Sequence, residues 1–186
     1  MTKINEHDKV KLTALTGLFA ALITAVTLIR VPAGINGYYH AGDALIYIAA
    51  LVLPPQYAVI ASMIGGCMAD FFAGAPEWVL FTAIIKPLTA LPFIIAKRCK
   101  ESKGVDYKFI CTLNIFLLFV SGIVTAVGYD YIAMGILYGF NTSFILAVSS
   151  GWIQPLASAI IYVVLGAVLD KAKIKDMFFE KGKVRS

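Results

Sequence analysis

Long apolar stretches recur along almost the whole of this chain, and they constrain its fold more than any other feature. The 186 residues are 60% hydrophobic and only 15% charged, with a mean hydropathy of +0.83. An apolar stretch of about 20 residues is the length that an α-helix needs to cross the hydrocarbon core of a bilayer. The sequence therefore predicts one all-α integral membrane domain over 1–186, with no room for a second, soluble domain.

Six membrane spans are predicted, forming a six-helix bundle. The second span is short, about 16 Å as a helix, so it must be tilted or shielded from lipid by protein. An outer loop at 31–42 is indicated by its Gly, Pro and aromatic residues. Residues 130–146 leave two alternatives open, because they extend the fifth helix or form a short outer helix and loop. The predicted spans are 12–30, 43–53, 56–73, 77–96, 109–129 and 147–169.

Basic residues are distributed unevenly around these spans. Of the sixteen Lys and Arg residues, only Arg30 and Lys86 lie outside three groups at one edge of the predicted bundle. Those groups precede the first span, fill the loop at 97–108 and form the tail after the sixth span. Because Lys and Arg are enriched on the cytoplasmic side of membrane proteins, we expect both termini in the cytoplasm of a bacterial-type cell. Basic residues that flank spans in this way do not indicate a nucleic-acid partner.

Motifs for several other functions are missing from the sequence. It has no P-loop for ATP, so an ATP-driven transporter would need another chain to bind the nucleotide. It has no HExxH or GxSxG motif, and we do not expect an enzyme. Three cysteines without a Cys/His cluster predict neither a disulfide set nor a metal site, and no cofactor is expected. No convincing cleavage site follows the first apolar run, which is therefore read as a retained span.

Polar and aromatic residues gather at the predicted outer ends of the spans. Carboxylates there, with little basic charge nearby, create a negative potential, although simple solvation of helix ends is the alternative. The tyrosines of the outer loop form either an interfacial belt or a lid, and His40 is either structural or part of the site. Flat rings with a few amide and carboxylate groups suit a planar heterocycle. Tyr131 and Gln154 belong to this outer set, and the candidate substrate-binding residues are Asn36, Tyr38, Tyr39, His40, Asp43, Asp70, Glu77, Trp78, Lys86, Tyr129, Asp130, Asn141 and Trp152.

Lys86 is the most informative single residue of this set. It lies about 13 Å into the fourth predicted helix, where a charge is costly unless it has a partner or faces a cavity. Three alternatives are open: a buried pair with Asp43, Asp70 or Asp130, a direct contact with the ligand, or an extended side chain whose ammonium group reaches the interface.

Small residues recur every four positions on the first predicted helix, at Gly17, Ala21 and Ala25. Small side chains at this spacing let another helix approach closely in lipid. The stripe serves either packing inside the bundle or docking of a partner membrane protein.

This pattern resembles the substrate-binding S components of energy-coupling factor (ECF) vitamin transporters, over nearly the whole chain. The resemblance lies in the six-span layout, the small-residue first helix and two stretches, HAGDALIYIAALVLPP at 40–55 and ADFFAGAPEWVLFTAIIKPL at 69–88. S components differ greatly in sequence between vitamins, so ligand residues are not carried over from other members. Pro87 departs from the small residue that many relatives have after the lysine. The positions that align in the second stretch are Asp70, Gly74, Pro76, Trp78 and Lys86.

The resemblance implies a protein that captures a micronutrient outside the cell and associates with a transmembrane coupling protein and two ATPases. The first-helix stripe would then contact the coupling protein. The acidic outer end favours a neutral or cationic heterocycle, and pyridoxine-like, hydroxymethylpyrimidine-like, queuosine-type, thiamine and riboflavin ligands all remain open. The alternatives are a stand-alone carrier or channel and, more remotely, an intramembrane enzyme.

Overall fold

Long helices make up most of the computed structural model, which describes residues 6–33, 37–103, 108–109, 111–149 and 151–172. The order of the elements is α1 (Glu6–Leu28), β1 (Arg30–Ala33), β2 (Gly37–His40), α2 (Gly42–Val52), α3 (Pro55–Phe72), α4 (Pro76–Ser102), α5 (Thr112–Thr125), the π-helix η1 (Ala126–Ala133), α6 (Met134–Tyr138), α7 (Phe140–Ser149) and α8 (Ile153–Lys171).

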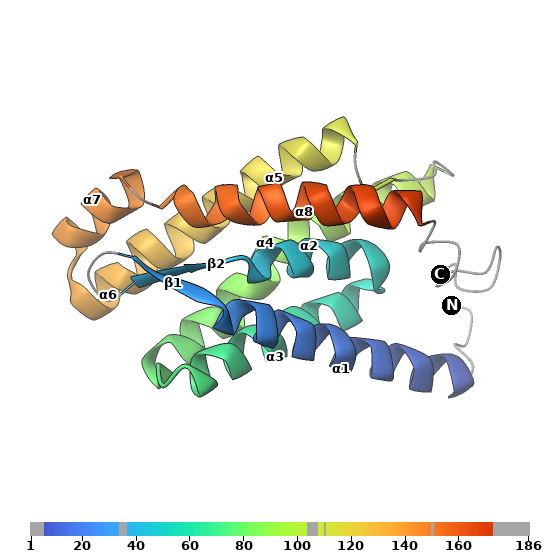
Figure 1. Ribbon diagram of the computed structural model, residues 1–186, viewed down its shortest axis with the longest axis horizontal. Helices are drawn as coiled ribbons and strands as arrows, with labels where there is room; N and C mark the ends of the chain where they lie inside the picture. The colour runs from blue at the N-terminus through green and yellow to red at the C-terminus, as the bar shows by residue number, and fades with distance from the viewer. Residues whose placement is uncertain (1–5, 34–36, 104–107, 110, 150, 173–186) are drawn as a thin grey trace.

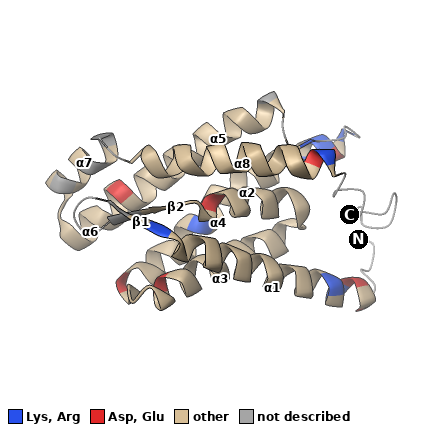
Figure 2. Ribbon diagram, in the orientation of Figure 1, with Lys and Arg blue, Asp and Glu red and all other residues tan. Residues whose placement is uncertain are grey.

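The long helices lie side by side along the length of the molecule (Figure 1). The start of α1 and the end of α8 lie at the same end of the bundle, and Lys and Arg residues gather there (Figure 2). The opposite end, called the outer end below after the predicted orientation, carries mainly acidic residues among those described (Figure 2). This arrangement agrees with the charge asymmetry of the sequence, while the cytoplasmic position of the termini stays a prediction.

Four described helical segments are long and apolar enough to cross a membrane, which supports the predicted class of helical membrane protein. They are Glu6–Leu28, Pro76–Ser102, Leu113–Tyr138 and Ile153–Lys171. The remaining two predicted spans correspond to α3, with 18 residues, and to the short apolar α2. Six membrane crossings therefore stay a prediction.

The predicted outer loop contains a β-hairpin, which sequence reasoning did not foresee. Strands β1 and β2 are antiparallel, with Arg30 opposite His40 and Val31 opposite Tyr39. Tyr and Val favour extended backbone, and Pro32 is tolerated because both strands of a two-stranded sheet are edges. The hairpin brings the chain from the end of α1 directly to the start of α2.

Several helix bounds differ from those expected. The fifth helix continues through η1 and α6 to Tyr138, and the short helix α7 follows. Of the two alternatives for 130–146, an extended fifth helix describes the first part of the segment and a short outer helix describes the second. The expected helix over 147–169 begins only at Ile153, since 147–149 belong to α7. Gly151 lies in the gap between them, and glycine is a poor helix former. The first helix begins earlier than expected, at Glu6, where acidic residues in the first turn favour a helix start.

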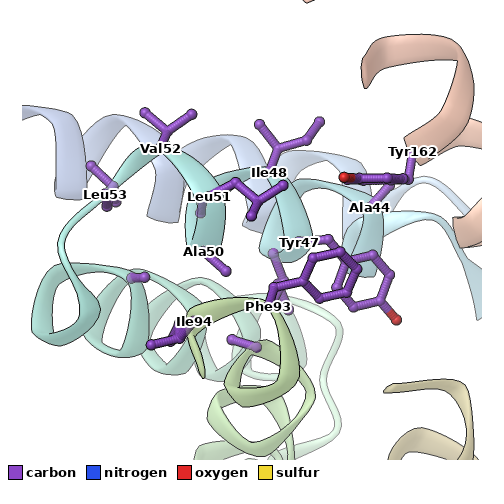
Figure 3. Packing of buried hydrophobic residues seen from close by; sticks show 14 of the residues in the cluster. Ala44, Tyr47, Ile48, Ala50, Leu51, Val52, Leu53, Phe93, Ile94 and Tyr162 are labelled. Atoms are coloured by element: carbon purple, nitrogen blue, oxygen red, sulfur yellow. The ribbon is translucent and has the colours of Figure 1, made fainter. Parts of the chain in front are cut away.

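Helix α2 forms the centre of the molecule and contacts α1, α3, α4 and α8. Its residues are buried almost throughout. In the core, Tyr47 stacks on Phe93 with ring centroids 4.8 Å apart, and Tyr162 meets Tyr47 edge-on at 6.0 Å (Figure 3). At its other end, the buried Lys97 donates a hydrogen bond to the carbonyl of Leu53 at 2.9 Å. The short second span is therefore shielded from lipid by protein. This was one of the two expectations for it, the other being a tilted helix.

Candidate functional site

An ion pair between Asp43 and Lys86 lies at the centre of the candidate site. Asp43 is in the first turn of α2 and is fully buried, and Lys86 of α4 is 2% exposed. The Lys86 Nζ lies 2.6 Å from Oδ1 of Asp43. Of the three carboxylates considered as partners for Lys86, the structure selects Asp43. Gln154 of α8 donates from Nε2 to Oδ2 of the same carboxylate at 3.0 Å, so three helices meet at Asp43.

Aromatic side chains border this ion pair. The Nζ of Lys86 lies 5.0 Å from the ring centroid of Tyr129, a distance at which the ring face attracts a cation. Tyr129 donates its hydroxyl hydrogen to Oγ1 of Thr82 at 2.8 Å. The ring of Trp78 lies 6.2 Å from that of Tyr129. Trp78, Thr82 and Lys86 are spaced by four residues, which places them on one face of α4.

The π-helix η1 positions Tyr129 in this network. It continues α5 without a break over Ala126–Ala133 and includes Asp130 next to Tyr129. A π-helical turn changes the face on which the following residues lie, and such turns occur frequently at functional sites. Gly128 lets η1 approach α4, because an added Cβ would lie 3.0 Å from the Ile85 side chain.

Gly66 of helix α3 has no side chain, and this leaves space for the side chains of Lys86 and Thr82. A Cβ added at Gly66 would lie 2.8 Å from Cγ of Lys86 and 2.7 Å from Cγ2 of Thr82. The stem of Lys86 therefore passes directly over the backbone of α3. A glycine at this position is what allows Lys86 to reach Asp43.

The hairpin closes one side of the network through His40. His40 is buried, and its Nδ1 accepts a hydrogen bond from the backbone N–H of Gly42 at 3.2 Å. Its carbonyl accepts a hydrogen bond from Ser158 of α8 at 3.4 Å. At the other strand, Arg30 donates to the carbonyl of Ala73 at the end of α3, at 3.4 Å. The hairpin is thus tied to helices on two sides of the bundle.

Other candidate residues lie outside this network or beside it. Glu77 and Asn141 are exposed, and Trp152, 44% exposed, stacks on Phe119 at 5.8 Å. Asp70 is buried one turn beyond Gly66 on α3, and Asp130 is half-buried with Oδ2 close to Gly151. Tyr39 is half-buried in β2. Asn36 and the side chain of Tyr38 lie outside the described part of the structure.

Sequence reasoning missed two members of the network and undervalued a third. Thr82 and Gly66 were not considered, although the four-residue spacing of Thr82 and Lys86 was a usable signal for the first. Gln154 was placed in the outer polar set but not among the candidate site residues. Its partner Asp43 is 111 residues away in sequence, so no local pattern connects the two.

The small-residue stripe of α1 faces outward. Gly17, Ala21 and Ala25 are exposed, and a Cβ added at Gly17 would meet nothing within 4 Å. The inward face of α1 packs closely on α3 at another small residue, Gly65, whose carbonyl accepts a hydrogen bond from Thr24 at 3.0 Å. None of the three residues therefore belongs to the buried core of the described structure. The stripe is open to lipid or to another protein.

The described residues contain no group of three His, Cys, Asp or Glu side chains that could hold a metal ion. What the network offers is a set of hydrogen-bonding groups and rings inside an apolar bundle. Such a combination suits a small planar ligand.

The chain is similar to a known family and to a protein of an archaeon. The sequence model of the family described as "ECF-type riboflavin transporter, S component" matches residues 7–171. A protein of Pyrococcus woesei, described as an uncharacterized protein in the gap 3′ region, is 29% identical over 120 residues, or 64% of this chain and 74% of that protein. The family match includes the whole network, from His40 to Ser158.

Proposed function

This chain belongs to the S-component family of ECF-type riboflavin transporters, and from that membership we propose that it is the substrate-capture subunit of an ECF-type importer. It is a membrane-embedded, substrate-binding protein of a transport family rather than of an enzyme family. In the proposed cycle it binds a small heterocyclic vitamin or related micronutrient at the outer side of the plasma membrane. A coupling protein and two ATPases then drive delivery of the ligand to the cytoplasm.

The observation that carries this proposal is the buried network around Asp43 and Lys86. A charged pair inside an apolar bundle costs several kcal/mol of desolvation free energy per ion, and hydrophobic residues of similar size would often stabilise the fold better. Ionisable residues within membrane proteins mark substrate pathways for this reason. Tyr129 adds a ring face beside the pair, and the ring of Trp78 lies next to that of Tyr129; such ring faces suit a planar ligand.

The proposed ligand is a neutral heterocycle. Lys86 and Asp43 form an ion pair with no net charge, so the pair leaves no unpaired charge that a charged ligand would have to neutralise. This argument favours the neutral alternative over the cationic one. Riboflavin is the first compound to test because the family description names it, with the other heterocycles considered above as comparison ligands.

The hairpin is the proposed lid, with Tyr38, Tyr39 and Asn36 beside the ligand. It precedes the site in sequence and is joined to it through His40. Its far end lies toward the outer end of the bundle, while His40 and Arg30 tie it to α8 and α3. Asp70, Glu77, Asp130, Asn141 and Trp152 are kept as proposed outer-side residues that a closed lid and ligand would approach.

The exposed stripe of α1 is the proposed contact for the coupling protein. Gly17, Ala21 and Ala25 leave the backbone of α1 accessible, and in lipid such stripes favour close helix–helix contact. The proposed topology has six crossings with both termini in the cytoplasm, on the side where the ATPases would bind.

One experiment tests the function directly. The protein is purified in mild detergent, the small molecule that copurifies is identified by mass spectrometry, and uptake of that molecule is measured in cells with and without the coupling protein and ATPases. We expect a heterocyclic micronutrient and uptake only with the full set of proteins. Uptake by this chain alone would instead establish the alternative of a stand-alone carrier.

A further inference from the structure

We propose that Gln154 is a specificity-determining residue, which accepts a hydrogen bond from an N–H group of the ligand while Lys86 donates to an adjacent acceptor. The inference rests on the proposed function, because it names the chemical edge that the same site recognises. The ligand class is a neutral heterocycle in which a hydrogen-bond acceptor lies beside a donor, as in a ring carbonyl next to a ring N–H.

The orientation of the Gln154 amide follows from its partner. An ionised carboxylate has only acceptors, so the group that meets Oδ2 of Asp43 must be the amide NH₂. The Oε1 of Gln154 is then turned away from the carboxylate. Among the described residues this oxygen accepts no hydrogen bond, while Gln154 itself is half-buried. A half-buried acceptor that has no partner among the described residues is a group that a ligand can use.

The ammonium group of Lys86 complements this acceptor. It has three N–H groups, of which one meets Oδ1 of Asp43, and the ring face of Tyr129 lies on another side. Within the described part of the chain its Nζ has no further hydrogen-bond partner. At least one N–H therefore remains for a ligand.

The shared carboxylate links these two groups. Lys86 meets Oδ1 of Asp43 at 2.6 Å and Gln154 meets Oδ2 at 3.0 Å, so the ammonium group and the amide are held by the same buried side chain. A ligand edge that matches them must present an acceptor to Lys86 and a donor to Gln154. Methylation of the donor nitrogen removes the hydrogen bond to Oε1 and adds bulk at the point of contact.

The test measures binding of matched ligand pairs to the purified full-length protein by quenching of tryptophan fluorescence. The probes are riboflavin with 3-methylriboflavin, 7-deazaguanine with its 1-methyl derivative, and 4-amino-5-hydroxymethyl-2-methylpyrimidine with its N,N-dimethyl derivative. For at least one pair, we expect methylation to weaken binding by about tenfold or more, since a site built around a hydrogen bond rejects analogues that lack it.

The variant Gln154→Met separates ligand recognition from support of Asp43. If Oε1 reads the ligand, the variant binds both members of the pair with similar affinity, because the methylated compound no longer loses a contact. If Gln154 acts only by holding Asp43, both affinities fall together and the ratio within the pair stays as in the wild type, which overturns the inference. Gln56→Met, an exposed Gln on α3, is the matched control and should keep the wild-type ratio.

A second variant guards against loss of folding. Gln154→Lys keeps a donor for Asp43 but has no acceptor, so the preference within the pair should again disappear. Failure of all three parent probes to bind the wild type would overturn the inference. In that case, coupling-dependent uptake of another heterocycle, such as pyridoxine, would leave the proposed transport function standing.

Discussion

At the scale of single residues, the pair of Asp43 and Lys86 has two roles that one substitution cannot separate. Lys86 is proposed to contact the ligand, and it also neutralises a carboxylate with no solvent exposure. Removing one partner of a buried ion pair typically costs about 3–5 kcal/mol, because the other charge is left unpaired. A loss of binding in Lys86→Met alone therefore does not distinguish a ligand contact from a folding defect.

The double variant Asp43→Asn with Lys86→Met makes this distinction. We expect Lys86→Met alone to lower the thermal unfolding midpoint in detergent, and the double variant to recover much of that loss because no unpaired charge remains. Ligand affinity should stay reduced in both, by about tenfold or more if a charged hydrogen bond is lost. Wild-type affinity in a folded double variant would assign the pair a purely structural role.

Gly66 allows a second test at this scale. Gly66→Ala places a Cβ where the stem of Lys86 now lies, so it should displace Lys86 from Asp43 and weaken ligand binding. Gly17→Ala is the matched control, because a Cβ there meets nothing within 4 Å and the residue is also helical. Both variants are assayed for ligand affinity as isolated proteins. Equal affinities would mean that the path of Lys86 over α3 is not needed for binding.

Part of this residue-level arrangement was predictable from the sequence. A lysine deep in an apolar helix requires a partner or a cavity, and that argument singled out Lys86 and offered Asp43 among three carboxylates. The choice of Asp43 depends on how α2 packs against α4, which no local pattern encodes. Glycines such as Gly66 carry no sequence signal for the side chain that crosses them.

At the scale of elements, α1 presents two faces with different demands. Its inward face packs on α3, and the three small residues of its outward stripe are exposed. The variant Ala21→Trp places a large ring on the outward face. We expect it to bind ligand as the isolated protein, yet to lose copurification with the coupling protein and ATP-driven uptake, because the ring prevents close helix contact.

Two outcomes for the Ala21→Trp variant would contradict this prediction. Joint loss of folding and ligand binding would mean that the stripe packs inside the molecule. Normal uptake would mean that neither packing nor docking uses the stripe. Val10→Trp, on an exposed part of the same helix near its start, is the control for a large exposed ring.

The presence of the long helices was predicted better than the local departures from α-helix, namely the hairpin and η1. Apolar length is set by the bilayer and can be read directly, so the long helices were recognised, although several of their ends differ by six residues or more from the expected ones. The hairpin and η1 were missed because both depend on tertiary contacts. The hairpin is short and tied through Arg30 and His40 to other elements, and η1 continues an apolar helix whose composition does not change.

At the scale of the whole molecule, the predicted orientation can be tested by labelling. In a variant without the three native cysteines, single cysteines are introduced at Asn36, Ala75 or Lys103. A membrane-impermeant thiol reagent added to intact cells should reach the first two and not the third. The reverse pattern would invert the topology and place the Asp43 network toward the cytoplasm.

The burial of α2 has a consequence for how ligand binding depends on bilayer thickness. Hydrophobic mismatch acts on helices that touch lipid, which respond to bilayer thickness by tilting. The helix that carries Asp43 is enclosed by four others, so its length of about 16 Å need not match any lipid. Acyl-chain length should therefore change the tilt of the surrounding helices before it changes the geometry around Asp43, and ligand affinity should vary little between vesicles of thin and thick bilayers.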